Sequence, residues 1–299
     1  MSLSRKSSTF SKSLKKEVMN MNIPRLFWLI ALPLAAIGLF VLFLPVLLNM
    51  AGLNHPYAGP KYEARGKRAL IITTSHGTLG DTGKKTGVYA SEMTVPYYTF
   101  LDGGMKVDVA SIQGGKIPIE PSSLRWPLLA PEDKRFLKDA DFKSKVDNSL
   151  KIDDLDFAHY DAIFIAGGWG AAYDLGFSEV LGEKLTQAYA AKVALGSVCH
   201  GALGFLNAKD EKGDPLVKGR RMTGVTDKQV RELRITMTPQ HPERELRNAG
   251  ALYESATAFR DIFASHVVSD GTIITGQNQN DGAETAQRMM KLIAGRDGR

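Results

Sequence analysis

The sequence contains the segment Val193-Ala-Leu-Gly-Ser-Val-Cys-His-Gly-Ala-Leu-Gly-Phe-Leu206. This segment starts with a short apolar run, passes through Cys199, His200 and Gly201, and continues into a second apolar run that can form a helix. A buried strand, a sharp turn that carries a nucleophile, and a helix together make a nucleophile elbow. The pattern therefore predicts that the turn lifts the Cys199 side chain out of the sheet edge and that Gly201 gives the backbone room to bend.

Cys199 is the only cysteine of the chain, which excludes an intrachain disulfide and a cysteine-based zinc cluster. A helix that begins directly after it would direct free N–H groups and the positive end of its dipole toward the sulfur. We expect that environment to lower the pKa of the thiol, and the thiolate is the reactive form. A buried structural cysteine is the alternative, but Cys-His-Gly at a strand-to-helix junction favours a reactive thiol.

The chain of 299 residues has an ordinary globular composition, so it can hold one large domain. Its net charge is +6, but residues 1–25 contain six basic residues and one acidic residue. The remainder is nearly neutral, and a nucleic-acid partner is therefore not expected.

Residues 26–48 contain no charged residue, and a run of that length can cross a bilayer as a helix. A cleavable signal peptide is the competing interpretation, but its apolar region is usually shorter. Because the basic residues precede the run, the positive-inside rule predicts a cytoplasmic tail over residues 1–25 and a body on the periplasmic or extracellular side. Residues 49–66 are expected to form a linker, and residues 67–296 the single globular domain.

Runs typical of strands and helices alternate along that domain, which predicts an α/β sandwich with a mostly parallel sheet. The predicted strands are residues 68–74, 106–110, 161–166, 193–198, 220–224, 266–268 and 272–275, and the predicted helices are residues 88–101, 131–140, 178–191, 227–233, 242–248 and 283–293. The last two strands flank Asp270-Gly271, a hairpin signal. Residues 114–158 form a long insertion, part of which is the predicted short helix.

Parallel sheets bind ligands at the carboxyl ends of their strands. His76, Gly168 and Cys199-His200 each follow a predicted strand, and a turn over residues 223–227 follows another, so we expect these residues to converge. The Gly168 amide and the elbow amides can serve as oxyanion donors, although a Gly-Gly pair also suits a plain turn. The histidines show no metal-ligand spacing, and the sequence has no phosphate-binding loop.

Several segments, in this order, resemble the PfpI-type, class I glutamine-amidotransferase-like superfamily. Within it, the form of the first segment and the insertion resemble the stress-inducible chaperone and glyoxalase III branch. The segments are Thr86-Gly-Val-Tyr-Ala-Ser-Glu92, Tyr160-Asp-Ala-Ile-Phe-Ile-Ala-Gly-Gly-Trp-Gly170, Ser197-Val-Cys-His-Gly201, Leu216-Val-Lys-Gly219 with Thr223-Gly224, and His266-Val-Val-Ser-Asp-Gly-Thr-Ile-Ile-Thr-Gly-Gln277.

The resemblance implies a flavodoxin-like sandwich, often dimeric, with Cys199 as nucleophile and His200 as its partner. It also implies that Glu92, which by sequence alone is more simply a surface carboxylate, touches the sulfur. The implied reaction converts methylglyoxal to lactate without glutathione, metal or other cofactor, with Gly168 and His200 amides holding the oxyanion. The sequence departs from the branch at Trp169, where a histidine is usual.

A second departure concerns the acidic residue that orients the histidine. The matching position is Val230, so Asp227 or Glu232 would have to take its place, or the triad is incomplete. Three hypotheses follow: a membrane-anchored enzyme acting on small dicarbonyls, a stress chaperone or cysteine redox sensor without enzymatic activity, and an amide or peptide hydrolase. We assign Cys199, His200, Glu92 and Asp227 to catalysis, and Gly168, Trp169 and His76 to substrate binding.

Overall fold

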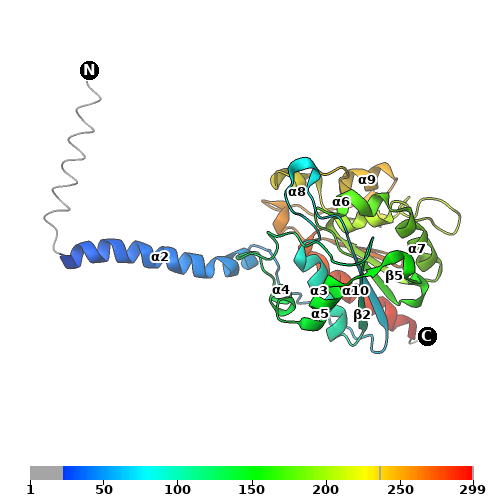
Figure 1. Ribbon diagram of the computed structural model, residues 1–299, viewed down its shortest axis with the longest axis horizontal. Helices are drawn as coiled ribbons and strands as arrows, with labels where there is room; N and C mark the ends of the chain where they lie inside the picture. Colours follow the sequence, from blue (N-terminus) through cyan, green and yellow to red (C-terminus); the bar gives the residue numbers. More distant parts are fainter. Residues whose placement is uncertain (1–22, 236, 298–299) are drawn as a thin grey trace, which may run out of the picture. The chain divides into compact units, whose positions relative to one another are not determined.

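A computed structural model describes residues 23–235 and 237–297 of the chain, which is drawn in Figure 1. The chain divides into two compact units, residues 1–48 and residues 49–299, and each is described by itself. Residues 1–22, which make up most of the predicted basic tail, lie outside the described residues.

The first unit contains most of the helix α2 (Ile23–Met50), which includes Pro33 and Pro45. Within α2, residues 27–50 have a mean hydropathy of 2.6, and their side chains are not buried against other parts of the protein. By length and composition this is the one helix in the described residues able to cross a membrane, and a signal sequence has the same two properties.

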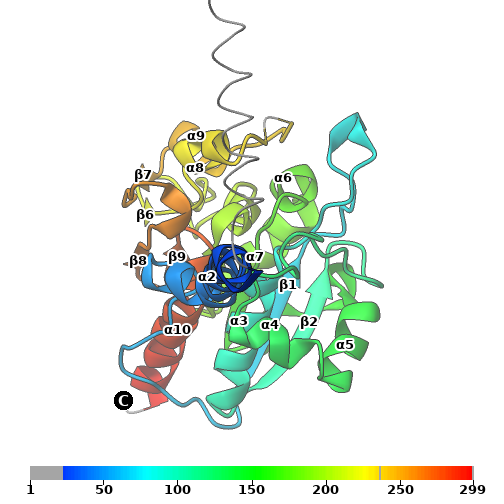
Figure 2. The same cartoon turned by 90° about the vertical axis from the view of Figure 1, so that its left-hand side faces the viewer.

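The second unit is built on a seven-stranded sheet with the order β3-β2-β1-β4-β5-β9-β8. Every pairing in this sheet is parallel except that of β8 with β9, which confirms the mostly parallel sheet. Figure 2 shows β1 and β2 toward one side and β8 and β9 toward the other. The strands are β1 (Arg68–Thr73), β2 (Lys106–Ser111), β3 (Leu150–Lys151), β4 (Ala162–Ile165), β5 (Ala194–Val198), β8 (Val267–Asp270) and β9 (Ile273–Gly276), with a separate parallel pair, β6 (Arg221–Met222) and β7 (Leu252–Tyr253).

Helices cover both faces of the sheet because successive strand residues point to opposite sides. Ala69 and Ile71 of β1 pack in one apolar cluster with α3 and α10, whereas Leu70 and Ile72 pack in a second cluster with α6, α7 and η5. The helices are α3 (Ala90–Asp102), α4 (Pro131–Phe136), α5 (Ala140–Asp147), α6 (Ala171–Asp174), α7 (Glu179–Ala190), α8 (Asp227–Glu232), α9 (Pro242–Asn248), α10 (Gly282–Asp297) and the 3-10 helices η1 (Gly80–Thr82), η2 (Ile152–Asp154), η3 (Phe157–His159), η4 (Leu175–Phe177), η5 (Cys199–Phe205), η6 (Asp261–Phe263) and η7 (Gln279–Asp281).

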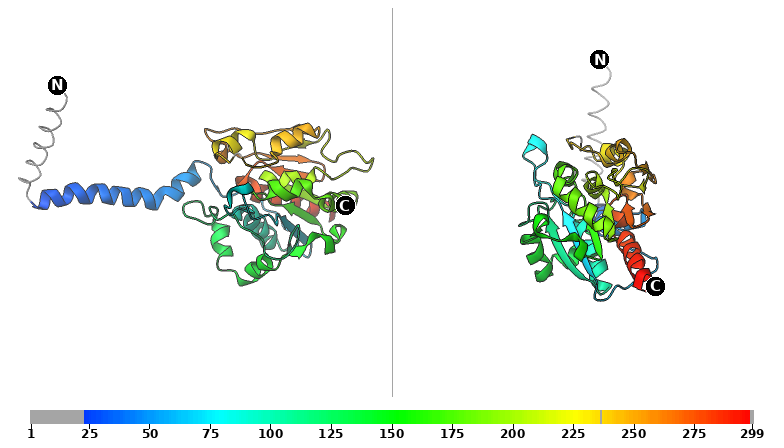
Figure 3. Two further views of the ribbon diagram at one scale, coloured as in Figure 1. Left: turned by 45° about the horizontal axis from the view of Figure 1, so that its top comes forward. Right: turned by 90° about the vertical axis from the view of Figure 1, so that its right-hand side faces the viewer.

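Most predicted elements are present within a few residues of their predicted ends. The elements missed are β3 and β7, each two residues long and too short to show a periodic pattern, the eight-residue helix α5, and several single-turn helices. The insertion over residues 114–158 holds α4 and α5 as two separate helices. Figure 3 shows α8, α9 and the β6–β7 pair, in yellow and orange, gathered together, so this late part of the chain forms its own layer beside the sheet.

Candidate active site

The elbow has the predicted strand-turn-helix order, with β5 leading into Cys199 and the 3-10 helix η5 following it. Cys199 has φ of +58°, in the left-handed region that costs a non-glycine residue roughly 1–3 kcal/mol. Gly201 is required sterically, since a Cβ there would lie 2.1 Å from the Ile165 carbonyl oxygen. The backbone is therefore bent in a strained turn that presents the sulfur at the carboxyl end of β5.

Glu92 supplies the carboxyl group that contacts the Cys199 side chain. It lies in the first turn of α3, is 1% exposed, and its carboxyl group hydrogen-bonds to Cys199. The Gly167 amide donates to Glu92 Oε2 at 3.0 Å, which fixes the carboxyl group from the other side. Segments that are far apart in the chain thus bring Glu92 and Cys199 into contact, as the resemblance implies.

The ionisation of this pair is governed by burial. Burial raises the pKa of Glu92 to about 8, against the lowering effect of hydrogen bonds from Cys199 and Gly167. Burial and then the negative charge of Glu92 raise the pKa of the Cys199 thiol, although Gly168 and His200 amides act in the opposite direction. The expectation of a lowered thiol pKa is therefore wrong, because two adjacent buried groups cannot both carry negative charge. At neutral pH both groups are therefore mainly protonated, Glu92 as the carboxylic acid and Cys199 as the thiol.

His200 touches the sulfur, with Nδ1 3.4 Å from Cys199 Sγ. Burial lowers the pKa of His200 to about 3, with a smaller contribution from His241, so the imidazole is neutral at neutral pH. Its other nitrogen, Nε2, is buried and has no hydrogen-bond partner among the described residues. Val230 is itself buried, in the same apolar cluster as Cys199. His200 therefore lacks the carboxylate that would stabilise an imidazolium.

Gly168 and Trp169 lie beside the elbow, Gly168 at the sulfur and Trp169 at the His200 ring. The Gly168 and His200 amides both donate toward Cys199 Sγ, which favours the thiolate. Gly168 has φ of +97°, and a Cβ on it would lie 2.4 Å from the Tyr89 amide nitrogen, so only glycine fits. The Trp169 ring packs 4.9 Å from the His200 ring. Cys199 is left 6% exposed, which suits a small reactant.

The structure places the Asp227 and His76 side chains in other contacts. Asp227 Oδ1 lies 3.4 Å from His241 Nδ1, and so the expected pairing with His200 is not formed. Glu232, the other candidate, accepts a hydrogen bond from the Asp261 amide. The His76 ring stacks on Tyr173 at 4.3 Å, and its Nε2 meets the Thr78 carbonyl oxygen. The His76 carbonyl oxygen lies close to Gly170 of the glycine-rich loop.

No pattern in the sequence places Tyr89 and His241 beside the site, although the Tyr89 amide borders Gly168 and His241 lowers the pKa of His200. Tyr89 precedes Glu92 by three residues but is the N-cap of α3 with extended backbone, so helix periodicity in the sequence does not place its side chain. His241 approaches the site through the packing of Pro242 near Gly224, which no local pattern reveals.

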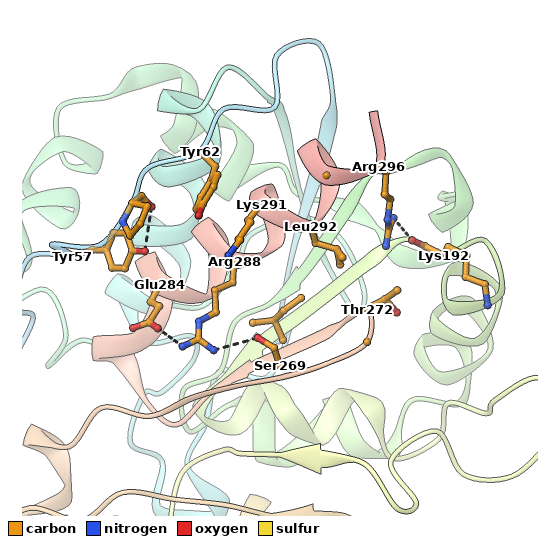
Figure 4. A pocket seen from close by; sticks show the side chains of 14 residues that line it. Tyr57, Tyr62, Lys192, Ser269, Thr272, Glu284, Arg288, Lys291, Leu292 and Arg296 are labelled. Atoms are coloured by element: carbon orange, nitrogen blue, oxygen red, sulfur yellow. Dashed lines mark hydrogen bonds and ion pairs between the residues drawn. The ribbon is translucent and has the colours of Figure 1, made fainter. Parts of the chain in front are cut away.

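A groove of about 1060 Å³ lies elsewhere, between the linker, the β8–β9 hairpin and α10 (Figure 4). Cys199, Glu92 and His200 are not among its lining residues. Two of its cations are already paired, Arg288 with Glu284 and Lys192 with Glu211. Within the described ranges no cluster of side chains is able to hold a metal ion. This groove is therefore separate from the site at Cys199.

Comparison with known proteins gives one consistent result. The profile of the DJ-1/PfpI family matches residues 85–292. Glyoxalase 3 of Candida albicans is 31% identical over 233 residues, which cover 74% of this chain and 95% of that protein. A glutathione-independent glyoxalase of Schizosaccharomyces pombe is 27% identical, covering 77% of this chain and 96% of its own length.

Solved structures agree with these relatives. The rapid encystment protein of 24 kDa from Francisella tularensis superimposes with a TM-score of 0.71 at 33% identity, covering 76% of this chain and 99% of its own. The crystal structure of glyoxalase III from Candida albicans has a TM-score of 0.69 at 28% identity, covering 76% of this chain and 97% of its own.

Proposed function

The chain belongs to the DJ-1/PfpI family, and from that premise we propose that it converts methylglyoxal and related 2-oxoaldehydes to hydroxy acids without glutathione. The observation that carries the proposal is the buried Glu92 carboxyl group hydrogen-bonded to Cys199. Relatives that this chain matches over nearly their whole length are named glutathione-independent glyoxalases, which supports the same chemistry.

In the first step the ionised form of Glu92, which is a minor fraction near neutral pH, takes the proton of the Cys199 thiol, and the sulfur forms a bond to the aldehyde carbon. The carbonyl π electrons move to oxygen, where the Gly168 and His200 amides stabilise the negative charge. Glu92 returns its proton to that oxygen, which completes a hemithioacetal. A carboxyl group with a pKa of about 8 suits such proton transfers near neutral pH.

In the second step the Glu92 carboxylate removes the proton from the former aldehyde carbon, and the electrons move to the ketone oxygen to give an enediolate. Glu92 then delivers this proton to the neighbouring carbon, and the hydroxyl proton of the former aldehyde oxygen moves to the former ketone oxygen, which gives a thioester on Cys199. Water cleaves the carbon–sulfur bond, which releases lactate and restores the thiol. The aldehyde carbon is oxidised and the ketone carbon is reduced by the same amount, so the reaction needs no external oxidant or reductant.

The other two hypotheses receive less support. A redox sensor relies on an accessible thiolate, whereas Cys199 is buried and its pKa is raised by burial and by Glu92. A peptide hydrolase of the triad type needs a carboxylate on the histidine, and His200 Nε2 has none among the described residues.

The test is lactate formation from methylglyoxal by the purified full-length protein in detergent, without glutathione. Formation of lactate in proportion to enzyme supports the proposal. A folded protein that forms no lactate from methylglyoxal, and no hydroxy acid from other 2-oxoaldehydes, would refute it.

Trp169 is expected to limit the size of the substrate. Replacing Trp169 with alanine should raise the ratio of kcat/KM for phenylglyoxal to that for methylglyoxal, because the indole fills space beside His200. The same change should lower the free energy of unfolding by roughly 3–5 kcal/mol, since a buried aromatic ring is lost. Urea unfolding and steady-state kinetics measure the two effects. Trp126→Ala, at an exposed site, is the control and should change neither.

We also propose that α2 anchors the domain in a membrane, with the tail in the cytoplasm and the domain on the other side. The apolar run of 24 residues and the basic residues before it support this placement. Replacing both Ile37 and Val41 with arginine should release most of the protein from membranes washed in alkaline carbonate, because each arginine costs roughly 2.5–3.5 kcal/mol at the centre of a span.

The control for the anchor is Phe259→Arg, which adds charge at an exposed apolar residue of the domain and should leave the protein in the membrane fraction. Protease added to spheroplasts should digest the domain of the wild-type protein. A domain that resists protease until the cells are lysed contradicts the proposed orientation.

A further inference from the structure

Tyr89 occupies a position from which its side chain can take part in the reaction. It is the N-cap residue of α3, three residues before Glu92, and its carbonyl oxygen accepts a hydrogen bond from the Glu92 amide at 3.0 Å. An N-cap residue and the third residue of its helix lie next to each other at the start of the helix, as in a capping box. The tight contact between the Tyr89 amide and Gly168 also packs this residue against the loop that supplies the oxyanion donor.

The hydroxyl group of Tyr89 is buried, although the residue as a whole is half-buried. The exposed part therefore belongs to the rest of the residue, and the hydroxyl end lies inside. Burial raises the pKa of the phenol, followed by the charges of Glu92, Asp133, Cys199 and Glu120. The two reacting groups thus act on this phenol, and it remains a protonated donor throughout the neutral range.

This hydroxyl finds no hydrogen-bond partner among the described residues. On the same helix, the Tyr98 hydroxyl donates to Asp139 at 2.9 Å. Near the elbow, the Tyr253 hydroxyl donates to the Gly224 carbonyl oxygen at 2.7 Å. A buried hydroxyl without a partner destabilises the folded state, so this donor is available to an acceptor brought by a ligand.

We propose that the Tyr89 hydroxyl donates a hydrogen bond to the second oxygen of the substrate, the ketone oxygen beside the aldehyde carbon attacked by Cys199. The inference rests on the proposed function and narrows it to aldehydes that carry an adjacent oxygen acceptor. Negative charge develops on that oxygen when Glu92 removes the proton from the neighbouring carbon. A preorganised donor at this oxygen lowers the energy of the transition state.

The test compares Tyr89→Phe with Tyr98→Phe in the full-length protein. Tyr89→Phe should lower kcat/KM for methylglyoxal by roughly 100-fold, as for the loss of one donor to a developing oxyanion, while its Tm stays the same or rises. Tyr98→Phe removes a satisfied hydroxyl from the same helix, so its Tm should fall and its kcat/KM should be unchanged. A merely structural role for Tyr89 predicts the opposite pattern, a lower Tm with unchanged kcat/KM.

A second readout follows alkylation of Cys199 by iodoacetamide and its protection by methylglyoxal. Tyr89→Phe should leave the alkylation rate unchanged without methylglyoxal and should require roughly tenfold more methylglyoxal for half protection, because one hydrogen bond of about 1.4 kcal/mol corresponds to that factor. Equal protection in wild type and Tyr89→Phe overturns the inference.

This readout separates the two proposals. A wild-type protein that is protected but forms no lactate refutes the proposed function alone, since the difference in protection still reports on Tyr89. A wild-type protein that forms lactate but is not protected by methylglyoxal overturns the inference about Tyr89 and leaves the proposed function standing.

Discussion

The Cys199→Ala variant is expected to form no measurable lactate from methylglyoxal. The sulfur is the atom that bonds to the aldehyde carbon in the proposed mechanism, and no other thiol exists in the chain. Loss of a catalytic nucleophile lowers kcat by a factor of roughly 10⁴–10⁶. The measurement is lactate release under conditions in which the wild-type protein is saturated, followed long enough to detect that range.

Cys199→Ser is the matched control because it keeps a hydroxyl of similar shape at the strained elbow position. The hydroxyl group is a far weaker nucleophile at its usual pKa, so this variant should be nearly as inactive while its circular dichroism and Tm stay close to those of the wild type. Retention of more than about one part in a hundred of the activity by either variant would contradict covalent catalysis by Cys199.

The second large effect is expected from Glu92→Gln. The amide keeps the shape of the carboxyl group and can still meet the Gly167 amide, but it cannot take a proton from the thiol or from carbon. General acid–base groups contribute roughly 10²–10⁴-fold, so kcat should fall by that range. Full activity in Glu92→Gln would assign the proton transfers to another group and remove the main support for the mechanism.

Glu92→Gln should at the same time stabilise the fold, with a defined dependence on pH. The pKa of Glu92 rises from 4.5 to about 8 on folding because of burial. Between those values the unfolded chain has released the proton that the folded protein keeps, so wild-type stability falls as pH rises from about 4.5 to about 8. Each unit of pKa difference corresponds to about 1.4 kcal/mol, and the cost at pH 8 reaches a few kcal/mol.

Replacing the Glu92 carboxyl group with an amide should abolish the loss of stability that accompanies rising pH. The variant should therefore have a higher Tm than the wild type at pH 8, with a smaller difference at pH 5. The measurement is thermal unfolding across that range. A difference in Tm that is constant with pH would show that Glu92 is ionised to the same extent in the folded and unfolded states.

The sequence predicts those parts of the fold that have a local pattern. The elbow segment predicts β5 and the turn at Cys199, because an apolar run followed by Cys-His-Gly is a local signature. The Asp270-Gly271 pair likewise predicts the β8–β9 hairpin, and Gly271 has the positive φ that this turn needs. In contrast, β3 and β7 have two residues each, and their pairing depends on partners supplied by distant segments.

The site was predictable only in part, because its contacts join distant segments. From sequence alone Glu92 is an ordinary helix carboxylate, and the family resemblance was needed to bring it to the sulfur. The partner of Asp227 was likewise not predictable, because it is His241, which lies at the start of another helix. Even the sign of the thiol pKa shift depended on burial and on Glu92 rather than on the local helix start.

The two edges of the sheet bear on whether copies of this protein can aggregate. One edge strand, β3, has only two residues and offers a short template for another chain. At the other edge, Arg288 donates to the Val267 carbonyl oxygen and to Ser269, and Arg220 and Arg221 contact Asp270. Short or charge-covered edges resist the strand-by-strand joining that leads to fibrils. The domain should therefore stay dispersed when it is crowded on a surface, and a pair of copies would associate through faces other than these edges.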